Sequence, residues 1–212
     1  MTQYDFLNPS NVLLRDSLRE IIISLNKIIK PGFNFGTITK KENPKEYFVS
    51  IVLNKIYSLN VSVENILLTN DIFLSIYLYR YIYELYLKIF YIFSGPSEEK
   101  IILRLNGFFE NKDLKITDYQ DGINDKFMIP KFKERHKEKY KTMSRIVHPN
   151  MESLNIHLNK TADEQFEFLV PTINLTIWHI VDIVRFFSNM KLLNLDKKID
   201  QEKLILLQRH EN

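Results

Sequence analysis

Apolar residues recur at helical spacing along most of the chain. Residues 9–30 carry leucine or isoleucine every three or four positions, and the pair Pro31 and Gly32 ends the pattern. We therefore expect a helix over this segment, capped by Asn8 or Ser10, because short polar side chains satisfy the first backbone N–H groups of a helix.

A second helix is indicated by Asn43 followed by Pro44, because a proline at the first helical position loses no needed hydrogen bond. Residues 61–68 either continue this helix, which would then cover 44–68, or form one turn. The same start and stop signals predict further helices at about residues 70–94, 97–109, 131–148, 171–193 and 200–210. Residues 110–130 are polar and show neither helical nor strand periodicity, so we expect them to form a surface loop. The pattern predicts an all-α bundle of six to seven helices in a single domain over residues 1–212.

Composition limits the classes of protein to consider. With 212 residues, 45% of them hydrophobic, the chain is long enough to bury a sizeable core. It contains no cysteine, which excludes disulfides, thiolate metal sites and a cysteine nucleophile. The first ten residues lack the pattern of a secretion signal, so we expect a cytoplasmic protein.

Residues 72–93 form an apolar segment long enough to cross a bilayer. The segment also contains Arg80, Glu84 and Lys88, and each charge near a bilayer centre costs roughly 2.5 to 3.5 kcal/mol. We therefore expect a buried helix of a soluble protein and no membrane partner.

The charges of this helix lie on one narrow stripe. On a helical wheel, roughly 80° of arc holds Tyr77, Arg80, Glu84, Lys88 and Tyr91. One interpretation is a surface ion pair between Arg80 and Glu84, worth a few tenths of a kcal/mol. The other is a polar groove, in which burial would force these two side chains to pair with each other or with a ligand anion.

The most basic part of the chain is residues 126–145, with eight lysines or arginines against two glutamates. Most of these cations face away from the apolar side of the predicted helix, which favours RNA or another polyanion as a partner. The candidate RNA-binding residues are Lys133, Arg135, Lys137, Lys139 and Lys141. Ser144 and His148 lie at the border of the two faces. A solvated Lys/Glu face with a helix-terminal histidine explains the same pattern.

Metal and cofactor sites are not expected. The five histidines lack the i, i+4 pairing of helical zinc sites, and cysteine ligands are absent. The chain contains no P-loop, no dinucleotide glycine motif and no nucleophile elbow. We interpret His179, Asp182 and Arg185, spaced three apart, as the exposed face of an amphipathic helix.

Two short motifs carry a family resemblance. Arg80-x3-Glu84 on an early helix and Tyr140-x3-Ser144-x3-His148-Pro149-Asn150 later resemble the pattern of a set of uncharacterised bacterial helical proteins. That set is similar to a distant branch of the HEPN superfamily, whose helical bundles occur in toxins and in abortive-infection or phage-defence systems. The resemblance covers about residues 65–193 and implies a core there, with the helices at 9–30 and 44–68 packed on it.

The resemblance implies a metal-independent endoribonuclease, commonly completed across a homodimer. His148 would move a proton, Arg80 or Arg145 would stabilise charge on the phosphate, and Glu84 would orient Arg80. Ser144 or Tyr140 would position His148 or the phosphate. HEPN ribonucleases separate their arginine and histidine by four to six residues, whereas only two separate Arg145 from His148. From this resemblance we expect a toxin of an antiviral defence system, acting with or without a partner protein.

Two other interpretations remain open. In the first, Arg80, Glu84 and His148 form a polar cluster that fixes helix packing in a non-catalytic interaction module. Its basic face would then bind an acidic protein partner or a nucleotide. In the second, the tyrosines of residues 72–93 line a pocket for a small molecule.

Overall fold

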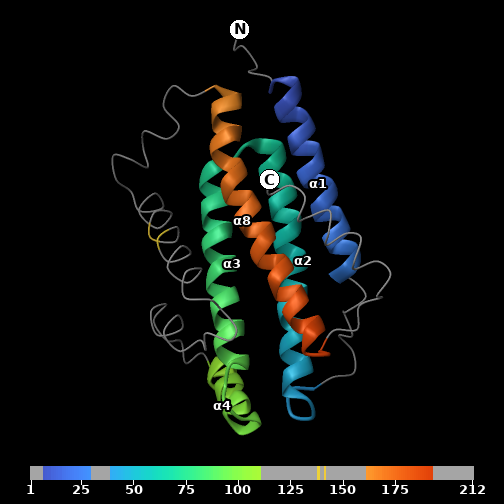
Figure 1. Cartoon of the computed structure of the whole chain (residues 1–212), viewed down its shortest axis with the longest axis vertical. Coiled ribbons are helices and arrows are strands. Elements are labelled where there is room, and N and C mark those ends of the chain that lie inside the picture. Colours follow the sequence, from blue (N-terminus) through green and yellow to red (C-terminus); the bar gives the residue numbers. More distant parts are fainter. Residues whose placement is uncertain (1–6, 30–38, 111–137, 139–140, 142–160, 193–212) are drawn as a thin grey trace.

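The computed structural model describes residues 7–29, 39–110, 138, 141 and 161–192 (Figure 1). The helices of this part are α1 (Pro9–Ile29), α2 (Pro44–Thr69), α3 (Ile72–Phe93), α4 (Glu98–Phe109) and α8 (Ala162–Asn189). Residues 138 and 141 are also helical, and the described ranges contain no strand. The all-α prediction is therefore confirmed for this part of the chain. The predicted loop at 110–130 and the predicted helix at 200–210 lie outside the described residues, except for Glu110.

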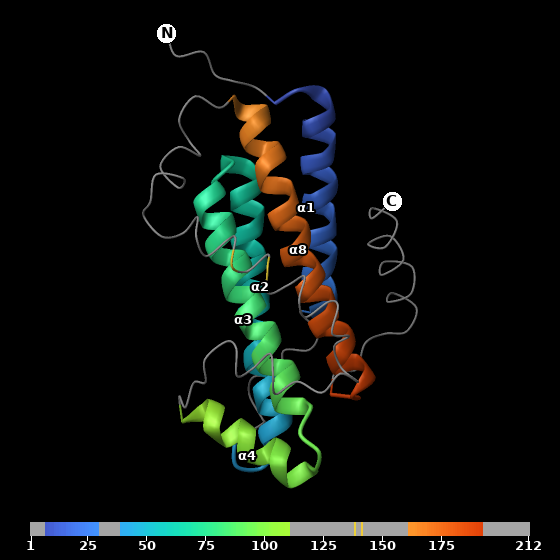
Figure 2. The same cartoon turned by 60° about the vertical axis from the view of Figure 1, so that its left-hand side comes forward.

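The four long helices run side by side, and the shorter α4 lies at one end of α2 and α3 (Figures 1 and 2). Among the described helices, the pairing of α3 with α8 is the most extensive, and α8 also packs against α1 and α2. Helix α4 packs against α2 and α3. The whole arrangement covers α3 from several sides.

The helix starts follow the capping residues that the sequence predicts. Asn43 accepts a hydrogen bond from the backbone N–H of Glu46 and precedes Pro44 at the start of α2. Residues 61–68 continue α2 without a break, which settles that alternative. Asn70 then adopts a left-handed conformation with φ 53°, which asparagine tolerates better than most residues. The chain thereby reverses, and Asp71 caps α3.

Helix α8 begins earlier than the sequence analysis predicts. It starts at Ala162 and not near Pro171, which lies inside the helix and is exposed to solvent. Thr161 and Glu164 form a reciprocal capping box that fixes the start. Our prediction gave too much weight to the proline, which removes one hydrogen bond but does not end a helix that is anchored on both sides. Burial of Phe166 and Leu169 provides the anchor on the N-terminal side.

The first turns of α1 and α8 are tied together by one carboxylate. The backbone N–H of Asn8 and the side-chain amide of Asn11 both donate to Asp163 Oδ1, each at 2.9 Å. These hydrogen bonds, the one from the Asn8 backbone first, lower the pKa of Asp163 below its usual value. The contribution of Asp163 to stability is therefore present at neutral pH and lost in acid.

Among the described helices, α8 alone is long and apolar enough to cross a membrane by length and composition. In its most apolar window, 56% of the residues are buried inside the protein. Packing against α1, α2 and α3 covers this buried part of α8. The charged helix α3 does not meet the same criterion.

Thr161→Ala should destabilise the fold by about 0.5 to 2 kcal/mol, because it removes the side chain that caps α8. Chemical denaturation followed by circular dichroism measures this free energy of unfolding. Ser10→Ala, at an exposed position in the first turn of α1, is the matched control and should change it little. Equal stability of the two variants would mean that α8 does not depend on this cap.

Candidate functional site

Helix α3 is buried over most of its surface. Fourteen of its 22 residues are buried, and the polar residues emerge along one side. Tyr77 is 53% exposed, and the side chains of Arg80 and Glu84 are 30% and 33% exposed. Lys88 and Tyr91 are half-buried. We call these five residues the α3 stripe.

The ion pair of the stripe joins Arg80 Nε to Glu84 Oε1 at 3.5 Å. Both side chains keep about a third of their surface in solvent, so the pair is neither fully exposed nor shut inside the core. At this exposure an ion pair contributes at most about 1 kcal/mol to stability. The pair therefore orients Arg80 more than it stabilises the fold.

Cations also approach the tyrosines beside the stripe. Lys55 of α2 places Nζ 5.1 Å from the centroid of the Tyr81 ring, which is 43% exposed. Partial burial raises the pKa of the Tyr81 hydroxyl, Lys88 lowers it and Glu84 raises it. The phenol therefore stays protonated at neutral pH and can donate a hydrogen bond.

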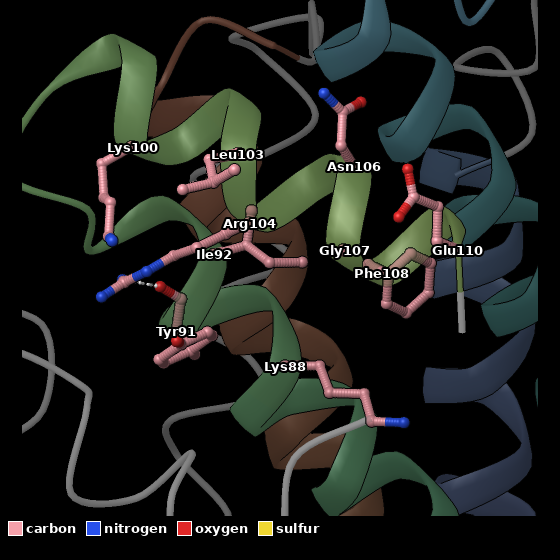
Figure 3. Close-up of a pocket in the computed structure, with 10 residues that line it drawn as sticks. All are labelled: Lys88, Tyr91, Ile92, Lys100, Leu103, Arg104, Asn106, Gly107, Phe108 and Glu110. Atoms are coloured by element: carbon pink, nitrogen blue, oxygen red, sulfur yellow. Dashed lines mark hydrogen bonds between the residues drawn. The ribbon is translucent and has the colours of Figure 1, made fainter. Parts of the chain in front are cut away.

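The C-terminal end of the stripe opens into a groove between α3 and α4 with a volume of about 430 Å³ (Figure 3). Lys88 and Tyr91 of α3 line it together with Lys100, Arg104 and Phe108 of α4. We call it the α3–α4 groove. Lys100 and Arg104 were not among the residues predicted for the site, although their i, i+4 spacing already placed both cations on one side of a short helix.

The prediction for His179 is wrong, as the side of α3 that faces α8 shows. His179, expected on the exposed face of α8, is only 1% exposed. Its ring lies 5.8 Å from that of Tyr79, 5.4 Å from that of Tyr83 and 4.7 Å from that of Tyr86, the last in a stacked arrangement. Asp182, at the edge of this interface, is half-buried. The helical wheel failed because α8 is covered on several sides, so a polar residue three positions from Asp182 still points into an interface.

The tyrosines of this cluster are held in an apolar environment. Burial, and after it the electrostatic interaction with Tyr83, raises the pKa of Tyr79 above its usual range. Burial, then Asp182 and Tyr83, raise the pKa of Tyr86 in the same way. Both phenols are neutral across the physiological range, so the cluster packs α3 against α8 without ionised tyrosine.

Most of the remaining candidate residues lie outside the described residues. These are Lys133, Arg135, Lys137, Lys139, Tyr140, Ser144, Arg145 and His148. Lys141 is helical and exposed, as expected for a cation that faces solvent. Arg80 and Glu84 are thus the two predicted site residues that the structure brings together. Their convergence with His148 stays a prediction.

Within the described ranges, no group of three or more histidine, aspartate or glutamate side chains has the arrangement of a metal site. His179 is enclosed by tyrosine rings, and Asp163 is engaged by Asn8 and Asn11. Charges of both signs reach the surface of α3 and α4, but the lining of the α3–α4 groove holds Lys88, Lys100 and Arg104 with one carboxylate, Glu110, so its charge is positive. This charge favours an anionic ligand over a cation.

His179→Ala should destabilise the protein by about 3 to 5 kcal/mol, because it leaves a cavity among three buried rings. Asp182→Ala, on the same helix but half-buried, should cost less than about 1 kcal/mol. Denaturant unfolding of both variants measures the difference. Equal losses would show that His179 is not an anchor of the α3–α8 interface.

Comparisons with protein-family models, with curated proteins and with solved structures find no match for this chain. The HEPN-like resemblance therefore rests on the two short motifs alone and stays a prediction. What the structure adds is the geometry of the first motif, the ion pair between Arg80 and Glu84.

Proposed function

We propose that this chain is an HEPN-like helical protein that binds RNA along the α3 stripe and the basic residues 126–145. The observation that carries the proposal is the Arg80–Glu84 pair, held half-exposed on a helix that is otherwise largely buried. A rigid core helix holds the guanidinium at a fixed place on the surface, which is a requirement for recognising a phosphate.

The residues along the stripe suit single-stranded RNA. The planar guanidinium of Arg80 matches the geometry of phosphate oxygens, and Lys88 adds a second cation two turns further along α3. Tyr77 and Tyr81 are partly exposed and offer ring faces on which bases stack. Glu84 limits the motion of Arg80, and its carboxylate repels a phosphate that approaches Glu84 itself.

Cleavage is the second part of the proposal. His148 would take the proton of a ribose 2′-hydroxyl, whose oxygen then attacks the adjacent phosphorus while the 5′-oxygen leaves and receives a proton. Arg80 or Arg145 would stabilise the charge on the phosphate, and Ser144 or Tyr140 would position the groups. A homodimer would supply the two motifs from different copies, and toxicity towards an infected cell would follow from RNA loss.

Two variants should separate binding from cleavage. Arg80→Gln should weaken binding of a labelled single-stranded RNA about three- to tenfold. The number of counterions released on binding, measured from the salt dependence of the affinity, should fall by about one. His148→Ala should retain binding but lose cleavage in the presence of a metal chelator, because the proton carrier is removed. Fluorescence anisotropy and gel analysis of the same RNA measure the two effects.

The matched control is Arg15→Gln, which breaks a comparable local ion pair between Arg15 and Asp16 on α1. It should leave both binding and cleavage unchanged. RNA binding that is equally strong in the parent and Arg80→Gln contradicts the binding surface. Cleavage that survives in His148→Ala contradicts the catalytic assignment.

A non-catalytic interaction module is the second candidate, and the exposed apolar residues of α3 favour it. Leu74, Tyr77 and Tyr81 are 44%, 53% and 43% exposed on the side that carries the stripe. Aromatic side chains of this kind are enriched in protein interfaces. Under this interpretation a partner protein, and not RNA, would cover the exposed side of α3. The protein would then cleave no RNA, and substitution of His148 would change no catalytic activity.

A further inference from the structure

The α3–α4 groove has the size of a small-ligand site. Its volume of about 430 Å³ falls within the range of roughly 300 to 1,000 Å³ that is usual for ligand pockets. One wall is the last turns of α3, and the other is α4, which folds back across α3 after Gly95 (Figure 3). Apolar and aromatic side chains, among them Phe108, form much of the lining. Such a mixture suits a ligand with a planar apolar part and a charged group.

The charge of the lining is positive. The lining contains three cations, Lys88, Lys100 and Arg104, and one carboxylate, Glu110, which is exposed at the end of α4. Lys100 forms no ion pair with any residue in the described part of the chain. Lys100 and Arg104 are four residues apart on α4, and like charges at this spacing destabilise a helix. An anion bound between them would relieve that repulsion.

Arg104 is held in place before any ligand binds. Its Nη1 donates hydrogen bonds to the backbone carbonyl of Tyr91 and, at 3.2 Å, to Ser94 Oγ. Its guanidinium carbon lies 4.0 Å from the centroid of the Tyr91 ring. These contacts hold Arg104 in the groove. The dipole of α3 adds to them, because the negative C-terminal end of a helix attracts a cation.

The donors of Arg104 are only partly used by these contacts. Both hydrogen bonds leave from Nη1, and the buried Nε has no hydrogen-bond partner among the described residues. Because Nε is buried, the donor capacity left for a ligand lies on Nη2, in a groove that Lys100 also lines and that is partly shielded from water. Two adjacent cations match the charge of a phosphate monoester, which is close to −2 at neutral pH.

We propose that the α3–α4 groove binds a small phosphate monoester with a planar apolar body. Arg104 and Lys100 bind the phosphate, Lys88 contributes positive potential from the α3 side, and Phe108 contacts the apolar body. The site does not depend on the RNA-binding function proposed above. A free metabolite and the phosphorylated end of a longer molecule share this chemistry, and the size of the ligand that binds distinguishes them.

The test uses the full chain and para-fluorophenyl phosphate, whose fluorine NMR signal broadens when it binds. Saturable broadening that excess phenyl phosphate reverses is expected, whereas para-fluorobenzyl alcohol should show none because it lacks the anion. Lys100→Gln should weaken binding about tenfold, the usual effect of losing a charged hydrogen bond. Lys41→Gln, at an exposed position in the turn before α2, is the matched control and should bind as the parent does.

A second variant blocks the space and leaves the charges unchanged. A Cβ added at Gly107 would meet no atom within 4 Å, so Gly107→Leu can be accommodated and should project into the groove. Helix α4 should form at least as well, since leucine is a better helix former than glycine. Circular dichroism checks the fold, and ligand binding should be lost.

Three results would overturn the proposal: no saturable binding by the parent, equal weakening by Lys41→Gln and Lys100→Gln, or unchanged binding by folded Gly107→Leu. An RNA carrying a 5′-phosphate, compared with the same RNA lacking it, tests the alternative source of the ligand. Binding of para-fluorophenyl phosphate without any RNA binding would support the groove and reject the RNA function. The reverse result would reject the groove alone.

Discussion

Helix α3 carries apolar or aromatic side chains around most of its circumference, and these must be shielded from water. Helices α2, α4 and α8 pack against it, and the pairing with α8 is centred on His179 and the tyrosines it contacts. Burying one fully apolar side chain contributes roughly 1.5 to 3 kcal/mol, so the fourteen buried residues of α3 outweigh any single polar contact on the chain. The positions of α2, α4 and α8 follow from this requirement, whereas α1 packs against α2 and α8.

The same requirement determines where chemistry can take place. Once α3 is covered, its charged residues can reach solvent only along the α3 stripe, and the helix holds them in a fixed order from Tyr77 to Tyr91. Because α4 is short and folds back, it covers the end of the stripe incompletely and leaves the α3–α4 groove. Rigid elements therefore position both candidate sites, and their cations point to anionic ligands.

Local signals in the sequence were sufficient for the first four helices. Asn43, Asp71 and Ser97 each cap a helix close to where the sequence predicted its start, because capping depends on residues within one turn. The predicted start of α8 near Pro171 was wrong, because the capping box of Thr161 and Glu164 begins the helix earlier in the chain and Pro171 lies inside it. His179 and Arg104 show a different limit. Their roles arise from contacts between helices, with Tyr86 and Tyr91, which no periodicity within one helix reveals.

The RNA-binding role of the α3 stripe is the central claim, and ultraviolet crosslinking tests it most directly. The full chain is irradiated with a uridine-rich single-stranded RNA, and the crosslinked residues are mapped by mass spectrometry. The account predicts crosslinks at Tyr77, Tyr81 or Tyr91, the partly exposed tyrosines of α3. Crosslinks confined to α1, α2 or α8, such as the exposed side of α1 around Leu13, or a complete absence of crosslinks, would contradict it.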